Sequence, residues 1–193
     1  SVEPGRTYRG KSTGTFGSAG VFSLNGNKII TSGGGGVIVT DDEKIAKMAK
    51  HLITTAKTPH KYEYYHDMIG YNFRMPNINA ALALAQFENI EKFIKEKRDL
   101  ANRYYEFFKE IDVIFRVEPK NSFCNYWLMC LEFSNKSKRD DFLNYSNEKK
   151  VMSRPIWKLM PNLPMFGHCK SDDLTNSKFL ESTIVNIPSS ASV

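Results

Sequence analysis

The sequence lacks the features that define several large classes of protein. No apolar run reaches the roughly 18 residues of a membrane-spanning helix, and the first residues contain no apolar stretch typical of a signal peptide. Its three cysteines and four histidines show no Cys-x-x-Cys or Cys/His spacing that would hold a metal. We therefore expect a cytoplasmic protein with reduced thiols, no membrane association and no metal site.

The overall composition is ordinary for a globular protein. Hydrophobic residues make up 41% of the 193 positions and charged residues 25%. The length suits one domain, or one domain plus part of another. The chain begins with Ser1 rather than with methionine, which predicts a processed product or a fragment.

The net charge of +6 is compatible with nucleic-acid binding. However, the lysines alternate with acidic residues along a helical pattern, as at Lys95, Glu96 and Lys97, which favours a solvated helix face. A mildly basic surface would also suit a substrate that contains a diphosphate. We therefore expect no nucleic-acid partner.

The hydrophobic pattern predicts an α/β chain. Short β-prone runs at 21–24 and 37–40 flank four consecutive glycines at 33–36, where the backbone is free to adopt positive φ angles. A helix is expected to follow. The candidates for its N-cap are Thr40, Asp41 and Asp42. Its apolar face comprises Ile45, Met48, Ala49 and Leu52.

The middle of the chain predicts a loop and then one very long helix. Residues 57–76 are aromatic and polar, and Asn77 would cap a helical pattern that runs without Pro or Gly to residue 111. A pattern of this length bridges two lobes or bends between them. We place a domain boundary within it, which divides the chain into domains 1–95 and 96–193.

Beyond the long helix the pattern becomes α+β. Strands are expected at 113–117 and 126–133, a helix at 138–149 and an extended segment at 151–157. A short helix and a strand at 184–188 would complete the second domain.

Residues 5–12 match the phosphate-loop pattern G-x-x-x-x-G-K-[ST]. A true phosphate loop follows a buried strand and opens a helix, whose N-terminus helps to hold the phosphates. Only four residues precede this match, and three glycines among residues 13–20 disfavour a helix. We interpret the match as a β-turn that exposes Arg9 and Lys11, and P-loop nucleotide binding remains the least favoured alternative.

One lysine lies in a setting that suits covalent chemistry. Lys28 lies between two predicted strands, five residues after Ser23 and shortly before the glycine run. A lysine that reacts with a carbonyl group must be partly desolvated at a cleft, so that its amine is neutral and nucleophilic. Ser23 would be able to donate a hydrogen bond to a phosphate oxygen. On composition alone, however, Lys28 is better explained as a surface residue.

Two long segments resemble the signatures of one enzyme family. Residues 13–17 and 20–35 resemble the cofactor-lysine segment of the DegT-like sugar aminotransferases, and residues 70–81 resemble a second signature at the same distance downstream. These are fold-type-I enzymes that use pyridoxal 5′-phosphate (PLP). The resemblance runs through essentially the whole chain, and implies part of a large PLP-binding domain followed by a small α+β domain.

The C-terminal half resembles one branch of that family. Residues 125–128, 152–157, 163–166 and 185–190 resemble the enzymes that aminate 4-keto sugars for legionaminic acid or bacillosamine. The implied reaction moves an amino group from glutamate to a UDP-linked 4-keto-6-deoxy-N-acetylhexosamine. Such enzymes act in the biosynthesis of polysaccharide and glycan sugars.

The resemblance also implies roles for individual residues. Lys28 would hold the cofactor covalently and then move the proton, and Ser23 would bind the cofactor phosphate. In a homodimer, Asn72 or Arg74 would reach the cofactor of the neighbouring subunit. The candidates for the substrate end are Asn125, Trp127, Arg154 and Trp157. Core packing is the alternative for the two tryptophans, and a surface ion pair is the alternative for Arg154.

The sequence has no counterpart of the N-terminal half of that family. In the family, that half supplies a phosphate loop, an aromatic group over the cofactor ring and the acidic partner of the pyridine nitrogen. We therefore expect a truncated chain that has little or no activity by itself. The alternative is a noncatalytic remnant that only associates with aminotransferase subunits.

Overall fold

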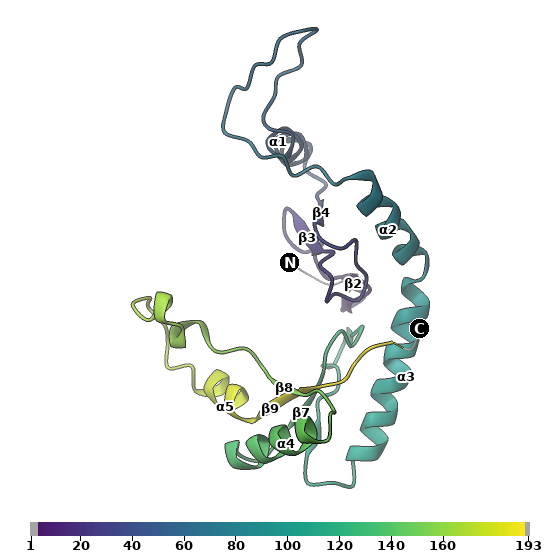
Figure 1. The fold of residues 1–193 in the computed structure, drawn as a ribbon, viewed down its shortest axis with the longest axis vertical. Coiled ribbons are helices and arrows are strands. Elements are labelled where there is room, and N and C mark those ends of the chain that lie inside the picture. The colour runs from purple at the N-terminus through teal and green to yellow at the C-terminus, as the bar shows by residue number, and fades with distance from the viewer. Residues whose placement is uncertain (1–3, 192–193) are drawn as a thin grey trace. The chain divides into compact units, whose positions relative to one another are not determined.

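The computed structural model describes residues 4–191 (Figure 1). The chain divides into two compact units. Unit 1 contains the residues up to Ile94 together with Pro119–Asn125. Unit 2 contains Lys95–Glu118 and the residues from Tyr126 onward. Each unit is described by itself below.

Unit 1 begins with a small three-stranded sheet in the order β2-β1-β6. Strands β1 (Thr7–Tyr8) and β2 (Lys11–Ser12) form a hairpin, and β6 (Ser122–Phe123) pairs with β1 from far along the chain. The hairpin turn has positive φ angles at Arg9 (49°) and Gly10 (76°). The predicted turn at residues 5–12 is therefore confirmed, and no helix follows it as a phosphate loop requires. The two strands around the turn were not predicted.

The second sheet of unit 1 is the hairpin of β3 (Gly20–Ser23) and β4 (Gly36–Val39), which confirms both predicted strands. Within the glycine run, Gly33 and Gly35 have φ angles of 81° and 86°. Helix α1 (Glu43–Ile53) follows β4. Of the three candidate caps it is Asp42 that caps the helix, since its carboxylate accepts from the backbone N–H groups of Lys44 and Ile45 at 2.7 and 3.2 Å.

The helical pattern predicted for residues 77–111 is present, but it is interrupted once and ends at Phe108. The structure has α2 (Asn77–Glu88) and α3 (Ile90–Phe108), separated at Asn89 (Figure 1). The side-chain amide of Asn89 donates to the carbonyl of Ala85 at 2.9 Å, so this residue satisfies one carbonyl in the last turn of α2. The predicted cap is wrong: Pro76 is the N-cap residue, and Asn77 is the first helical residue.

Unit 2 is an antiparallel sheet in the order β5-β7-β9-β8 with helices around it, which confirms the predicted α+β pattern. Its strands are β5 (Ile114–Phe115), β7 (Met129–Glu132), β8 (Arg154–Pro155) and β9 (Ile184–Ile187). Its helices are α4 (Lys136–Glu148), α5 (Thr175–Thr183), the last part of α3, and the 3-10 turns η1 (Met160–Asn162) and η2 (Pro164–Phe166). The two 3-10 turns were not predicted.

Each unit has its own hydrophobic core. In unit 1, Leu24, Ile29 and Ile30 are buried against Ala83 of α2. In unit 2, the buried apolar residues come mainly from the strands, and they are Ala101, Phe115, Tyr126, Met129, Leu131, Phe133, Ile184, Val185 and Ile187. Among residues 4–191, no helix has the length and apolar character needed to cross a membrane.

Candidate functional site

Lys28 lies in a tight turn directly after β3. The backbone N–H of Lys28 donates to the carbonyl of Asn25 at 3.0 Å, and the N–H of Asn25 donates to the hydroxyl of Ser23 at 3.4 Å. Asn25 thus connects the two predicted cofactor residues. Both Ser23 and Lys28 are partly buried. A residue with a hydroxyl group and a residue with an amine therefore lie on one hydrogen-bonded loop.

The two residues after Lys28 anchor this loop. Ile29 and Ile30 are 7% and 0% exposed, and they pack in the cluster with Leu24 and Ala83. Burial of one such side chain contributes roughly 1.5–3 kcal/mol. The apolar pair therefore fixes the position of the chain next to Lys28, while the lysine itself lies outside the core.

The glycine run closes back on β3 through backbone hydrogen bonds. The N–H of Leu24 donates to Gly35 O at 3.0 Å, and the N–H of Ser32 donates to Leu24 O at 3.1 Å. From α2, the side-chain amide of Asn79 donates to Ser32 O. Sequence reasoning assigned no role to Asn79. Its position in the first turn of α2, within the second signature, is the only signal that would have indicated one.

Asn72 and Arg74 lie on a segment that pairs with the end of α1. The N–H of Tyr71 donates to Leu52 O at 2.7 Å, and the N–H of Phe73 donates to Ile53 O at 3.0 Å. Gly70 permits this approach, because a Cβ atom there would lie 2.4 Å from the backbone nitrogen of Ala56. Both Asn72 and Arg74 are exposed.

Two histidines, to which the sequence gave no role, tie the preceding loop to α1. The ring of His51 contacts the carboxylate of Asp67 at 2.6 Å, and the Nδ1 atom of His66 lies 2.7 Å from the carbonyl oxygen of Thr55. The described residues contain no group of three His, Cys, Asp or Glu side chains that would hold a metal ion.

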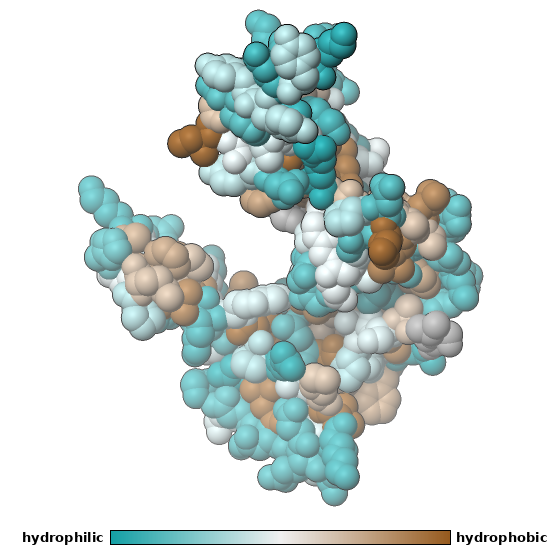
Figure 2. Space-filling view, turned by 45° about the horizontal axis from the view of Figure 1, so that its top comes forward, coloured by the Kyte–Doolittle hydropathy of each residue, from teal (hydrophilic) through white to brown (hydrophobic). Residues whose placement is uncertain are grey.

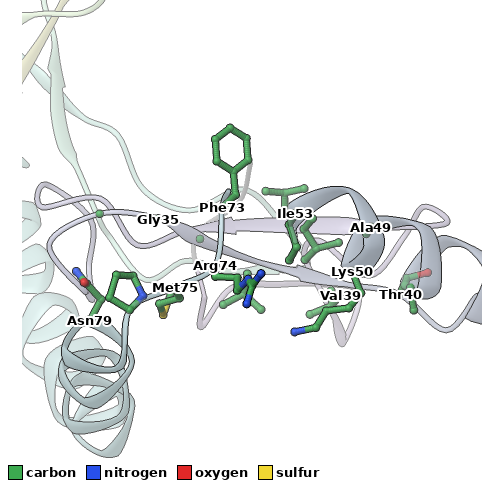
Figure 3. A pocket seen from close by; sticks show the side chains of 17 residues that line it. Gly35, Val39, Thr40, Ala49, Lys50, Ile53, Phe73, Arg74, Met75 and Asn79 are labelled. Carbon is green, nitrogen blue, oxygen red and sulfur yellow. The ribbon is translucent and has the colours of Figure 1, made fainter. Parts of the chain in front are cut away.

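A groove of about 1000 Å³ lies between β4, α1 and the segment that leads into α2. Most of its lining is apolar, with Lys50, Arg74 and Asn79 among the polar members. Figure 3 shows Lys50 and Arg74 on the same side of the hairpin, with Phe73 pointing the other way. Neither Ser23 nor Lys28 lines this groove. The structure therefore brings Arg74 to the groove and keeps the lysine loop outside it.

Asn125 also belongs to unit 1 and is fully buried. Its amide nitrogen donates to Pro4 O at 2.8 Å, and its side-chain oxygen accepts from Nε of Arg6 at 2.8 Å. The side chain thus holds the start of the first hairpin next to β6. Sequence reasoning did not single out Arg6.

The remaining three candidates lie in unit 2. The rings of Trp127 and Trp157 are 6.4 Å apart between centroids, with planes 30° apart. Trp157 is 67% exposed, so it is not a core residue. Arg154 is exposed at β8, where its guanidinium contacts the sulfur of Met152 at 3.5 Å.

Comparison with known proteins identifies the family of this chain. Residues 4–193 match the model of the DegT/DnrJ/EryC1/StrS aminotransferase family. The chain is 36% identical over 165 residues to GDP-perosamine synthase of Escherichia coli O157:H7, covering 84% of this chain and 44% of that protein. It is 37% identical over 163 residues to the putative PLP-dependent aminotransferase EpsN of Bacillus subtilis, covering 84% and 42%.

Solved structures share the fold. The aminotransferase TlmJ from Streptoalloteichus hindustanus superposes with a TM-score of 0.88 at 19% identity, covering 96% of this chain and 50% of that one. The PLP form of the putative sugar aminotransferase Spr1654 from Streptococcus pneumoniae gives 0.87 at 20% identity, covering 98% and 51%. The chain thus spans about half the length of the relatives that it matches. With the family model matched over nearly every residue, the chain belongs to the DegT/DnrJ/EryC1/StrS aminotransferase family, whose cofactor is PLP.

Proposed function

We propose that this chain is the lysine-bearing part of a PLP-dependent aminotransferase that acts on a nucleotide-linked keto sugar. The observation that carries the proposal is the turn in which Asn25 connects Ser23 to Lys28, directly before the buried pair Ile29 and Ile30. Such an anchored loop fixes the backbone from which an amine and a hydroxyl donor extend. This preorganisation is what a covalently held anionic cofactor requires.

The residues present fit PLP in their chemistry. The cofactor has an aldehyde, which reacts with an amine, and a phosphate, which needs hydrogen-bond donors. Lys28 supplies the amine, and Ser23 supplies a hydroxyl donor on the same loop. When bound, PLP supplies an electron sink that makes amino-group transfer between a donor and a keto carbon accessible.

Each candidate residue of unit 1 then has a defined task. The Ser23 hydroxyl would donate to the cofactor phosphate, and the amine of Lys28 would take and return the proton at the reacting carbon. Asn72 and Arg74 lie on a backbone segment fixed by α1, and we assign them to the neighbouring subunit's cofactor in a homodimer. The side chain of Asn125 is fully buried. Its hydrogen bonds with Arg6 and Pro4 hold the start of the first hairpin.

The substrate that we propose is a UDP-linked 4-keto-6-deoxy-N-acetylhexosamine, with glutamate as the amino donor. The names of two similar proteins support an amino sugar as the product: the GDP-perosamine synthases, whose sugar is linked to GDP, and PseC of Helicobacter pylori, an aminotransferase of pseudaminic acid biosynthesis. The UDP link and the glutamate donor rest on the resemblance of the C-terminal half. In unit 2, the exposed Arg154 would pair with the diphosphate, and Trp127 and Trp157 would contact the substrate.

We place the domain boundary of the enzyme at residues 95–96, within α3. A second candidate function is favoured by the groove, because neither Ser23 nor Lys28 lines it. In that case the chain would act as a noncatalytic subunit that associates with aminotransferase subunits. The two candidates differ in whether this chain itself holds PLP.

A PLP titration followed by absorbance distinguishes the candidates. The catalytic proposal expects saturable binding with a shifted absorbance band, abolished by Lys28→Ala and retained by Lys44→Ala. Lys44 is the matched control because it is an exposed lysine of the same unit. Equal binding by both variants would contradict the catalytic proposal and support the noncatalytic one.

A further inference from the structure

The two tryptophans of this chain, Trp127 and Trp157, form one pair. Their offset, tilted arrangement is a favourable geometry for aromatic rings. Trp157 leaves two-thirds of its surface exposed, at 67%, whereas Trp127 is partly buried beneath it. Unit 2 thus exposes the ring of Trp157, with the ring of Trp127 beside it.

A buried cation holds the backbone of Trp127. Lys97, on α3, is only 6% exposed. Its ammonium donates to the carbonyl of Trp127 at 3.4 Å and to the carbonyl of Ser189. The hydroxyl of Ser189 donates to the same Trp127 carbonyl at 3.0 Å. Burying a lysine is unfavourable unless its charge is well solvated by polar groups, so this site is built around those carbonyls.

The residue before Trp127 is fixed as well. Tyr126 adopts a left-handed φ angle of 47°, which costs roughly 1–3 kcal/mol in a non-glycine residue. Its ring is stacked on Phe115 and lies under the guanidinium of Arg98, which itself pairs with Glu118. Adjacent residues of α3, Lys97 and Arg98, therefore hold adjacent residues of the turn. The result is a rigid turn that sets the direction of Trp127.

We propose that Lys97 is a positioning residue which, through the carbonyl of Trp127, holds the two-tryptophan surface against which a flat ring of the substrate stacks. This inference rests on the proposed function in one respect, namely that the substrate is a nucleotide sugar. The ring is the nucleobase, which is planar, or the hexose, whose C–H groups pack against an aromatic side chain. Stacking of a base on an aromatic residue is sequence-tolerant and changes affinity by about ten-fold or more.

Intrinsic tryptophan fluorescence tests the proposal without PLP. The sequence has two tryptophans, so the whole signal comes from this pair. The 193-residue chain is titrated separately with UDP-N-acetylglucosamine, UMP and N-acetylglucosamine. We expect a saturable fluorescence change with UDP-N-acetylglucosamine. A response to UMP alone identifies the base as the stacked ring, and a response to N-acetylglucosamine alone identifies the hexose. No response to any of the three overturns the proposal.

Lys97→Met removes the ammonium and keeps most of the apolar stem. We expect it to weaken UDP-N-acetylglucosamine binding by about ten-fold and to change the near-UV circular dichroism of the tryptophans. The control is Lys95→Met, because Lys95 lies on the same helix with an exposed side chain paired to Asp99. Unchanged affinity in Lys97→Met, or equal losses in both variants, would overturn the positioning role.

Trp157→Ala keeps the proposal testable if Lys97→Met fails to fold. Its side chain is exposed, so the fold should persist, and Trp127 remains as the reporter. Binding must weaken in this variant; unchanged binding would refute the stacking surface. The outcome is separable from the proposed function, since PLP attachment at Lys28 is measured independently. Nucleotide-sugar binding without attachment refutes the enzyme, and attachment without nucleotide-sugar binding refutes this inference alone.

Discussion

The two units bury their strands to different degrees. In unit 2, three of the four residues in each of β7 and β9 are buried. In unit 1, β4 has three exposed residues and one partly buried residue, and none of the residues in α1 is buried. Apolar side chains of unit 1 such as Val21, Ile38 and Ile78 remain at the surface. Figure 2 shows such hydrophobic residues between hydrophilic ones.

The two units also differ in how much apolar surface they bury and in which candidate residues they carry. Unit 2 closes its sheet with its own helices, for example through the contact of Phe133 with Phe142 of α4 at 5.1 Å between centroids. Unit 1 carries the lysine loop and the groove, and buries only a small apolar cluster around Leu24. The proposed cofactor lysine thus lies in the unit with the smaller core, and the proposed substrate surface lies in the unit with the larger one.

The largest effect should come from the core of unit 2. Leu131→Ala in β7, at a position with no exposed surface, should lower the free energy of unfolding by about 2–5 kcal/mol. Ile38→Ala in β4, where the side chain is 47% exposed, should change it by less than about 0.5 kcal/mol. Urea denaturation followed by circular dichroism measures both. Equal losses of unfolding free energy in the two variants would contradict the difference in burial between β7 and β4.

Gly70→Ala should disrupt unit 1 locally. The added Cβ would lie 2.4 Å from the nitrogen of Ala56 and 2.5 Å from the carbonyl carbon of Thr55, so the segment must move at a cost of about 1–3 kcal/mol. Faster hydrogen exchange at the amides of Tyr71 and Phe73 would report it. Gly26→Ala, where a Cβ meets nothing within 4 Å, is the control and should leave these amides protected.

Asp42→Ala should weaken α1 by about 1 kcal/mol, because two backbone N–H groups lose their acceptor. Thermal unfolding measured by circular dichroism would show the loss. Asp41→Ala is the matched control, since the cap contacts come from Asp42. A larger effect of Asp41→Ala would contradict the assigned cap.

The smallest effect should be electrostatic and lie in unit 2. The hydrogen bond from Lys138 holds the pKa of Asp112 below its usual value of 3.8. A lowered carboxyl pKa contributes stability above the unfolded-state pKa, and this contribution is lost as the pH falls through the folded-state value. An NMR titration of the Asp112 carboxyl should show the lowered pKa, and Lys138→Met should return it toward normal. An unchanged titration in Lys138→Met would show that the pair does not persist in solution.

The sequence predicted the elements that are determined by residues close together in the chain. The β3–β4 hairpin, the glycines with positive φ and the cap at the start of α1 each follow from a few neighbouring residues. The break at Asn89 was missed because no Pro or Gly marks it, and asparagine is compatible with both a helix and its end. The pairing of β6 with β1 was missed because it joins segments far apart in the sequence.

The residues of the candidate site also divide into those that a local sequence signature predicted and those that depend on distant residues. Lys28 and Ser23 were found because their spacing resembles a family signature, and the structure connects them through one neighbour, Asn25. Lys97 was wrongly expected on a solvated face, because it lies among charged residues on α3. Its burial depends on carbonyls 30 and 92 residues away, which no local pattern encodes.

The central claim is that Lys28 holds the cofactor, and attachment mapping tests it most directly. The chain is incubated with PLP, reduced with borohydride and digested, and the labelled peptide is identified by mass spectrometry. The account predicts the label on Lys28, in the peptide that also contains Ile29 and Ile30, at about one label per chain. A label on another lysine, or one spread evenly over the exposed lysines, would contradict it.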